Sequence, residues 1–269
     1  MSKQADLISD IKKSYDQLRI KKGDILYITG NVSQLARTKI KKKELLDIFL
    51  DTSLDHLGSG GTIFSPSASM NLCNTNIPFD ITNTPSHSMG ALAEHIRGSK
   101  DAVRSFHPFW SISGIGPQAN ILKNVSRHAY GLGSPWTYFL DLDVMQVNVG
   151  LHPSRAVTLI HHLEVAAGVP YRYSKEFLHP VVSDKKINVE PFYMSVMYLN
   201  SDIKKRIALN EHFFQELDSL DMLNHSKQSN GLDMWSFSMR DFKKVATQYF
   251  IKDIYNYLEQ APKIRPYQK

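Results

Sequence analysis

The sequence predicts an α/β fold: a mixed, largely parallel central sheet flanked by helices, with a helical C-terminal portion. Short buried strands alternate with amphipathic helices over the first two thirds of the chain, a pattern typical of sheets that contain parallel pairs. The last third is mainly helical. Its clearest signal is an apolar stripe with helical spacing, formed by Phe242, Val245, Tyr249, Phe250, Ile254, Tyr257 and Leu258.

The individual elements follow from local patterns. We expect helices where apolar residues recur on one face, and strands where short apolar runs end at Gly, Pro or Asp. The expected helices span 2–18, 41–57, 89–98, a segment from 134, the segment around 161, 202–220 and 238–260. The expected strands span 25–28, 62–64, 144–150 and 192–199.

Two polar stretches are predicted to be irregular. Residues 67–85 are rich in Asn, Thr and Ser and contain two prolines, a composition typical of loops. Loops of this length inside a compact chain are usually functional or mobile. Residues 225–231 are expected to be a polar connector between the last two helices.

Composition favours one domain over residues 1–269. Apolar residues make up 42% and charged residues 22%, which is ordinary for a soluble globular protein. No apolar run approaches the roughly 18 residues that span a bilayer, and the residues after Met1 lack the apolar core of a signal peptide. The single cysteine, Cys73, fits a reducing compartment. We therefore expect a cytoplasmic protein without membrane partners.

The charge balance favours ligands that carry phosphate. The formal net charge is +6 and the pI is about 9.2, and basic proteins often bind anionic partners. However, the chain has no zinc-finger spacing, RNP-like motif or alternation of arginine with aromatic residues. A small-molecule partner is therefore expected rather than a nucleic acid.

The segment VTLIHHLE, residues 157–164, contains the strongest chemical signal. It places His161 and Glu164 three residues apart in a helical pattern, so the two side chains share one face. A carboxylate in that position fixes the tautomer of the imidazole and raises its basicity, as a general base requires. The same spacing also occurs in structural helix ion pairs and around buried histidines, and both interpretations stay open here.

Five segments carry a resemblance to a known family. In chain order they are GGTIFSP (60–66), TPS with MGALAE and Arg97 (84–97), RSFHP (104–108), YGLGSP (130–135) and TLIHHLE (158–164). This succession resembles the aminoglycoside 3-N-acetyltransferase family, also called the antibiotic N-acetyltransferase family. The resemblance covers a core of about 23–173 within the single domain and leaves a C-terminal strand and helices, 187–260, outside it.

The resemblance implies transfer of an acetyl or other short acyl group from acyl-CoA to an amine on a sugar-like ring, without a metal ion. It maps the family's catalytic histidine onto His161 and its acidic partner onto Glu164. Attack of an amine on a thioester releases a proton, which a neutral imidazole can accept. We therefore expect direct transfer in a ternary complex, with no acyl-enzyme.

Five further residues are candidates for binding CoA. The loop after the first strand contains Thr29, Asn31 and Ser33, whose polar groups could stabilise the thioester oxygen, because ligands bind beyond the carboxyl ends of strands. A plain turn is the alternative. Arg104 and Ser105 are candidates for the CoA phosphates, and a surface ion pair is the alternative for Arg104.

Three residues are candidates for binding the acceptor. Asp80 and Glu94 could hold substrate hydroxyls or the amine. His107 precedes a proline and is the third candidate, although it could equally shape the turn.

The chain departs from the family pattern where the acceptor is concerned. Where the family has a His-Ser-Ser-Leu-like run, this chain has Ile-Thr-Gly-Asn at residues 28–31. A lysine-rich stretch follows Arg37, and an aspartate typical of the family is replaced near Arg155. With the basic charge, this favours a nucleotide-linked amino sugar as acceptor. The alternatives are an aminoglycoside drug, or a non-catalytic member that binds a nucleotide or a protein partner. The last alternative predicts loss of the His-Glu pair.

Overall fold

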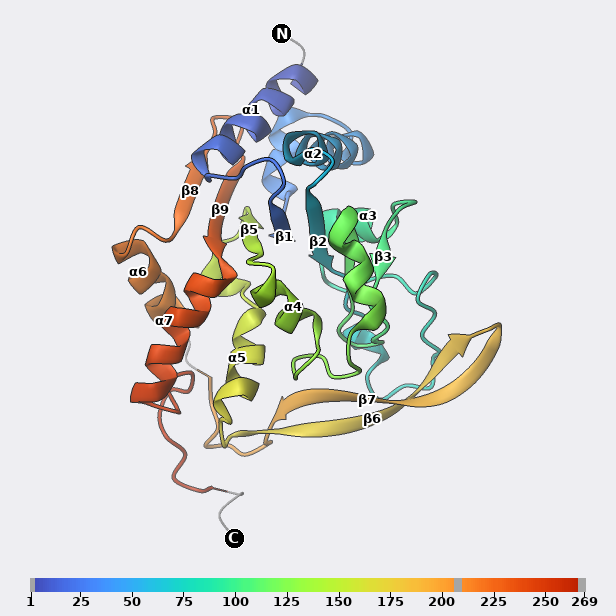
Figure 1. The fold of residues 1–269 in the computed structure, drawn as a ribbon, viewed down its shortest axis with the longest axis vertical. Coiled ribbons are helices and arrows are strands. Elements are labelled where there is room, and N and C mark those ends of the chain that lie inside the picture. The colour runs from blue at the N-terminus through green and yellow to red at the C-terminus, as the bar shows by residue number, and fades with distance from the viewer. Residues whose placement is uncertain (1–2, 206–209, 266–269) are drawn as a thin grey trace.

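The computed structural model describes residues 3–205 and 210–265 (Figure 1). Its centre is a sheet of seven strands in the order β3-β4-β2-β1-β5-β9-β8. The strands are β1 (Ile25–Gly30), β2 (Thr62–Pro66), β3 (Val103–Arg104), β4 (Ile112–Ile115), β5 (Met145–Val149), β8 (Asn224–Lys227) and β9 (Asp233–Ser238).

Parallel pairing is confined to the middle of the sheet. β1 pairs in parallel with β2 on one side and with β5 on the other. The pairs β2–β4, β3–β4, β5–β9 and β8–β9 are antiparallel. The expected mixed α/β fold with flanking helices and a helical C-terminal portion is confirmed. The term "largely parallel" holds only for the central three strands, where the crossover through α2 makes the parallel β1–β2 pair possible.

Helices cover both faces of the sheet (Figure 1). They are α1 (Lys3–Gln17), α2 (Lys42–Leu57), α3 (Ala91–Arg97), α4 (Pro135–Asp141), α5 (Leu159–Ala167), α6 (Glu211–Ser219) and α7 (Met239–Lys252). Consecutive strand residues alternate between two cores, because side chains along a strand point to opposite faces. Ile63 packs in the core with α1, α2 and α3, whereas Phe64 packs in the larger core with α4 to α7. None of the described helices combines the length and apolar character needed to cross a membrane.

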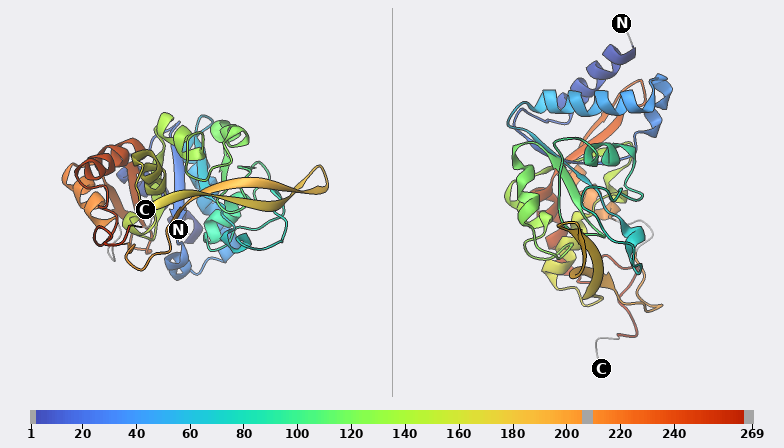
Figure 2. Two further views of the ribbon diagram at one scale, coloured as in Figure 1. Left: turned by 90° about the horizontal axis from the view of Figure 1, so that it is seen from below. Right: turned by 90° about the vertical axis from the view of Figure 1, so that its right-hand side faces the viewer.

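A separate ribbon of two long strands, β6 (Arg172–Ser183) and β7 (Lys186–Met197), crosses one end of the molecule and extends beyond it (Figures 1 and 2). The sequence predicted only part of β7, as the strand 192–199. β6 was missed because its residues 173–176 are all exposed. Such a stretch lacks the alternation of apolar and polar residues that marks a half-buried strand.

The C-terminal third corrects three other expectations. The helix expected over 202–220 is present as α6, which begins only at Glu211, and residues 206–209 of that range lie outside the described residues. The expected connector 225–231 instead contains β8 and the turn into β9, a polar edge pair in which β8 buries only Ser226. The helix expected over 238–260 ends at Lys252. The stretch 67–85 is irregular as expected, apart from a short 3₁₀ turn at Met70–Leu72.

Candidate active site

Helix α5 brings His161 and Glu164 into contact. The Nδ1 atom of His161 lies 2.7 Å from Oε2 of Glu164. The Glu164 side chain is completely buried, whereas 21% of the His161 side chain is exposed. The helix ends at Gly168, whose positive φ of 65° is a conformation that glycine adopts without strain. The helix thus presents a buried carboxylate behind a histidine that reaches the surface.

Two residues that the sequence analysis did not single out complete this cluster. Arg172, the first residue of β6, places Nε 2.9 Å from Oε2 of Glu164 and Nη2 3.1 Å from Nδ1 of His161. The hydroxyl of Tyr171 donates to Oε1 of Glu164 at 2.9 Å. Both oxygens of the carboxylate are therefore engaged. No local spacing rule links the helix to the strand that follows it, so the sequence carried no signal for these contacts.

The electrostatics of the cluster favour a neutral imidazole and an ionised carboxylate. Burial lowers the pKa of His161; the hydrogen bond and charge of Glu164 raise it, and Arg172 and Lys205 lower it again, so that it stays below its usual value. Burial raises the pKa of Glu164, but the hydrogen bond from His161 and the charge of Arg172 outweigh burial and bring it below its usual value. An ionised carboxylate accepts hydrogen bonds only, so Nδ1 of His161 carries the proton. Nε2 makes no hydrogen bond within the described residues.

Aromatic rings fix the orientation of the His161 imidazole. The ring of Tyr130 packs edge-on against it at a centroid distance of 5.3 Å, and the ring of Tyr257 at 6.2 Å. His162 points elsewhere, and its Nδ1 hydrogen-bonds the backbone carbonyl of Tyr130 at 2.7 Å. His161 is thus the only member of the His-His pair that belongs to the cluster with Glu164.

A cavity of about 590 Å³ lies at the carboxyl ends of β1 and β2. It adjoins α5 through Thr158, which stands one helical turn before His161 and therefore on the same side of the helix. Trp110 also lines it and packs against Tyr130, the neighbour of His161. Its lining among the described residues is Tyr27, Thr29, Gly30, Asn31, Pro66, Ser88, Met89, Gly90, Trp110, Leu151, Arg155, Ala156 and Thr158. That lining contains one arginine and no carboxylate.

The loop after β1, which the sequence analysis proposed as a ligand-binding segment, borders two cavities. Thr29 and Asn31 line the cavity beside α5, and Ser33 lines a neighbouring cavity of about 330 Å³ that also includes Asn31. Oδ1 of Asn31 accepts a hydrogen bond from the backbone N–H of Ser33 at 2.9 Å, which closes the turn. Gly30 has a φ of 133°, and a Cβ there would lie only 2.0 Å from the carbonyl oxygen of Val149. Only glycine fits at this position.

Arg104 and Ser105 lie elsewhere and serve the fold. All five guanidinium N–H groups of Arg104 have acceptors, namely Ser111 Oγ, the carbonyls of Ile81, Thr84 and Ser67, and Ser69 Oγ. Oγ of Ser105 accepts from the backbone N–H of Ile112 at 2.9 Å, beside the β3–β4 pairing. The expected phosphate contact therefore has no free donor on Arg104, and neither residue lines the cavity beside α5. Neither is Arg104 in a surface ion pair, because it is buried.

His107 is buried as well, with only 3% of its surface exposed. Its Nδ1 accepts hydrogen bonds from the backbone N–H groups of Phe109 at 3.3 Å and Trp110 at 3.0 Å. Burial lowers its pKa to about 3. The structure thus supports the alternative interpretation, in which His107 shapes the turn, and leaves the residue no surface with which to bind an acceptor.

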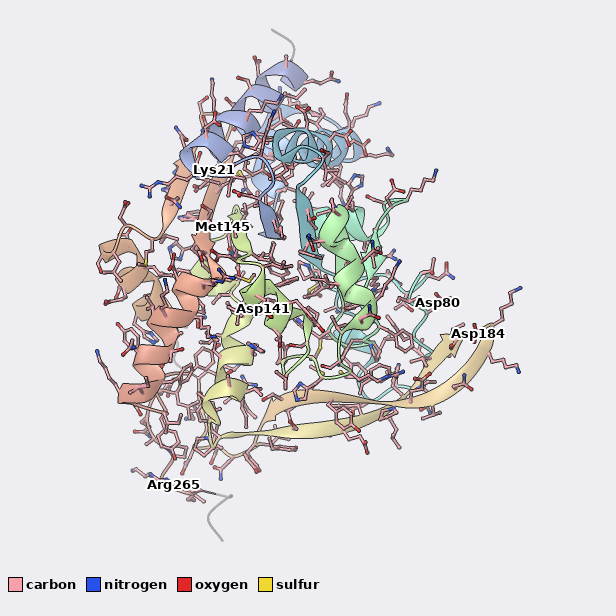
Figure 3. The ribbon with its side chains drawn as sticks, in the orientation of Figure 1. Lys21, Asp80, Asp141, Met145, Asp184 and Arg265 are labelled. Carbon is pink, nitrogen blue, oxygen red and sulfur yellow. The ribbon has the colours of Figure 1, made fainter. Side chains whose placement is uncertain are left out.

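Asp80 and Glu94 hold the polar loop in place. Asp80 accepts hydrogen bonds from the backbone N–H groups of Thr82 and Asn83. It lies on the side of the molecule nearest the free end of the ribbon, where Asp184 stands (Figure 3). Glu94 pairs with Arg97 at 2.7 Å and accepts from Ser86. Neither carboxylate lines the cavity beside α5, so the structure does not bring them together with His161.

Comparison with known sequences identifies relatives. A family model described as aminoglycoside 3-N-acetyltransferase matches residues 33–251. Aminoglycoside N(3)-acetyltransferase III of Acinetobacter baumannii is 32% identical over 96 residues, which are 35% of this chain and 33% of that protein. Aminoglycoside N(3)-acetyltransferase VII of Streptomyces paromomycinus is 30% identical over 100 residues, which are 36% of this chain and 34% of that protein. The match thus spans about a third of each of these curated relatives.

Solved structures share the fold over nearly the whole chain. AAC-IIIb in a binary complex with CoASH superposes with a TM-score of 0.78 at 16% identity, over 95% of this chain and 98% of that one. Aminoglycoside acetyltransferase AAC(3)-Xa gives 0.77 at 16% identity, over 96% and 99%. The YokD protein from Bacillus subtilis gives 0.73 at 19% identity, over 91% and 99%. These likenesses show a shared fold, and the match of residues 33–251 to the family model shows that the chain belongs to the aminoglycoside 3-N-acetyltransferase family.

Proposed function

We propose that this chain is an acyl-CoA-dependent N-acyltransferase that moves an acetyl or other short acyl group onto the amine of an amino sugar, with His161 as general base. One observation carries the proposal. The imidazole of His161 has its Nδ1 held 2.7 Å from the buried carboxylate of Glu164, and its Nε2 makes no hydrogen bond within the described residues. Family membership supports the reaction class.

The proposed chemistry is a single acyl transfer. Nε2 of His161 accepts a proton from the attacking amine, while a C–N bond forms at the thioester carbon and the C–S bond breaks. The proton then returns from the imidazolium to the leaving thiolate, which gives the free thiol of CoA. The ionised Glu164 stabilises the imidazolium between these two steps.

The cavity beside α5 suits the thioester arm of acyl-CoA. Its lining offers the hydroxyl of Thr29, the amide of Asn31 and the guanidinium of Arg155, and no carboxylate among the described residues. The hydroxyl and the amide can hydrogen-bond the neutral amide and thioester groups of that arm, and the guanidinium favours negative charge. We assign Thr29 and Asn31 to the thioester end, where negative charge develops on the carbonyl oxygen during attack. Ser33 lines the neighbouring cavity, which shares Asn31 with the cavity beside α5, and we assign it to the same ligand.

Two acceptors remain in competition, each favoured by a separate observation. The net charge of +6 favours an amino sugar linked to a nucleotide. A third cavity, of about 500 Å³, shares Arg155 with the cavity beside α5, and its lining includes Glu211, Asp218 and Trp235. Its carboxylates favour a polycationic acceptor of the aminoglycoside kind. The His-Glu pair argues against a non-catalytic family member.

The deciding experiment follows free thiol release from acetyl-CoA with a panel of amino-sugar nucleotides and aminoglycosides. Release with the nucleotides alone supports the biosynthetic acceptor, and release with the aminoglycosides alone supports a resistance enzyme. His161→Ala serves as the control for background hydrolysis. If neither class of acceptor increases thiol release above that control with acetyl-CoA or other short acyl-CoA donors, the proposed activity is refuted.

A further inference from the structure

We propose that Arg172 is a positioning residue for acyl transfer, which holds Glu164 and the ring of His161 in their working arrangement and anchors both to the β6–β7 ribbon. The inference rests on the proposed function of His161. It adds a residue from outside α5, the helix that carries both His161 and Glu164.

The contacts of Arg172 converge on the catalytic pair. On one edge of its guanidinium, Nε lies 2.9 Å from Oε2 of Glu164 and Nη2 lies 3.1 Å from Nδ1 of His161. Its Nη1 donates to the backbone carbonyl of Ser195, on β7, at 3.1 Å. Only 7% of the Arg172 side chain is exposed, and none of the Glu164 side chain. Movement of either side chain would leave the other buried charge without its partner, which is energetically costly.

Glu164 and Arg172 compete for the same ring nitrogen. A carboxylate requires a proton on Nδ1, whereas a guanidinium donor requires a lone pair there. With Nδ1 protonated, Nε2 is left as the basic nitrogen; the other tautomer would protonate Nε2 and remove the base. The shorter distance to Glu164, 2.7 Å against 3.1 Å, favours the productive tautomer. Arg172 therefore acts chiefly on Glu164: it holds the carboxylate that accepts the Nδ1 proton and so selects this tautomer.

Charged and titratable groups reach His161 from several elements. Glu164 lies on its own helix, Arg172 on β6 and Lys205 in the segment after β7. The rings of Tyr130 and Tyr257 come from the loop before α4 and from the segment after α7. Glu164 favours the protonated imidazole, while Arg172 and Lys205 disfavour it. Loss of Arg172 should therefore make His161 easier to protonate.

The test compares Arg172→Gln and Arg172→Lys with Arg127→Gln. Arg127 is the matched control, because it also ties the ribbon to the body, through Glu190 and the rings of Phe106 and Phe192, without contacting His161. The readouts are the pH dependence of kcat/KM, the separate values of kcat and KM, and titration of the His161 ring by ¹⁵N NMR. His161→Ala identifies the resonance.

We expect Arg172→Gln to lower kcat by about tenfold, since small misplacements of reacting groups are costly. KM for acetyl-CoA should stay near that of the wild type. The acid limb of kcat/KM and the ¹⁵N midpoint of His161 should both move to higher pH. Arg172→Lys keeps the charge but not the planar fork, so its midpoint should stay near that of the wild type while kcat falls part of the way.

Two outcomes would overturn the inference. In one, folded Arg172→Gln keeps the kcat and His161 midpoint of the wild type and loses only thermal stability. In the other, Arg127→Gln changes the midpoint and kcat as much as Arg172→Gln does. The ¹⁵N titration needs no turnover, so it tests the influence of Arg172 on His161 even if the wild type transfers no acyl group. Absence of transfer by the wild type would instead count against the proposed function.

Discussion

Arg104 and Arg172 both carry a guanidinium into the protein interior, but their partners differ in kind. Arg104 meets neutral carbonyl and hydroxyl oxygens that join β3 to the polar loop. Burial, followed by repulsion from Arg97, lowers its pKa to about 9. Arg172 instead meets an ionised carboxylate and an imidazole. The first arginine organises backbone, and the second organises side chains that can exchange protons.

Two histidines show the same contrast: His107, which follows Arg104 closely in the chain, and His161, which contacts Arg172. His107 uses Nδ1 to accept two backbone N–H groups, and burial keeps it neutral with a pKa of about 3. His161 has Nδ1 fixed by a carboxylate and Nε2 without a hydrogen bond within the described residues. A buried histidine surrounded by backbone is thus structural, whereas one with a carboxylate on one nitrogen and a cavity nearby is suited to catalysis.

The sharpest test of the contrast is His161→Ala. We expect kcat to fall by about 10²–10⁴-fold, the usual contribution of a general base. Binding of CoA, measured by calorimetry, should stay near that of the wild type, because the substitution leaves Thr29 and Asn31, the residues assigned to the thioester end, in place. Unchanged turnover would remove His161 from the mechanism and erase the difference between the two histidines.

Arg104→Met tests the other side of the comparison. It leaves several buried acceptors without donors, so we expect the free energy of unfolding to fall by about 3 kcal/mol or more. KM for acetyl-CoA, measured at a temperature where the variant is folded, should not change. A variant with normal stability and a raised KM for acetyl-CoA would mean that Arg104 binds the CoA phosphates after all.

His107→Asn sharpens the comparison through pH. The folded pKa of about 3 lies below the unfolded value of about 6.5, so the unfolded chain takes up one more proton as the pH falls. The stability contributed by His107 is therefore complete above pH 6.5 and is lost between about pH 6.5 and pH 3, at about 1.4 kcal/mol per pH unit.

Asparagine can still accept a backbone hydrogen bond but does not titrate. When the pH is lowered from 6.5 to 5, the free energy of unfolding, measured with urea, should thus fall by about 2 kcal/mol less in the variant than in the wild type. Parallel stability curves for the two proteins would mean that His107 is not the neutral, buried group that its contacts indicate.

Glu164→Gln should give the smallest effect. The neutral imidazole is the active form, and the pKa of His161 lies below its usual value, so activity falls only as the pH drops below about 6.5. Both the hydrogen bond to Glu164 and its charge raise this pKa; Gln removes the charge and weakens the hydrogen bond. The acid limb of kcat/KM should therefore move to still lower pH, with kcat reduced about tenfold, or ~1.4 kcal/mol. A limb at the wild-type position would make Glu164 purely structural.

The sequence was informative where geometry is local. The spacing of His161 and Glu164 is enough to place them on one helical face, and Thr29 and Asn31 follow a recognisable buried strand. Arg172 and Tyr171 reach Glu164 because β6 turns back beside α5, and no periodicity within either segment encodes that return. The partners of Arg104 could not be predicted, because the sequence shows its charge but not the carbonyls and hydroxyls that surround it.

The close approach at Gly30 limits how this family member can diverge. Any side chain at residue 30 would strike the carbonyl oxygen of Val149, so substitution of residue 30 cannot reshape the cavity. Inherited changes in ligand preference are instead expected at other positions that line the cavity, such as Ser88, Met89 and Leu151. Lineages that diverge in substrate should thus differ there while retaining the same glycine.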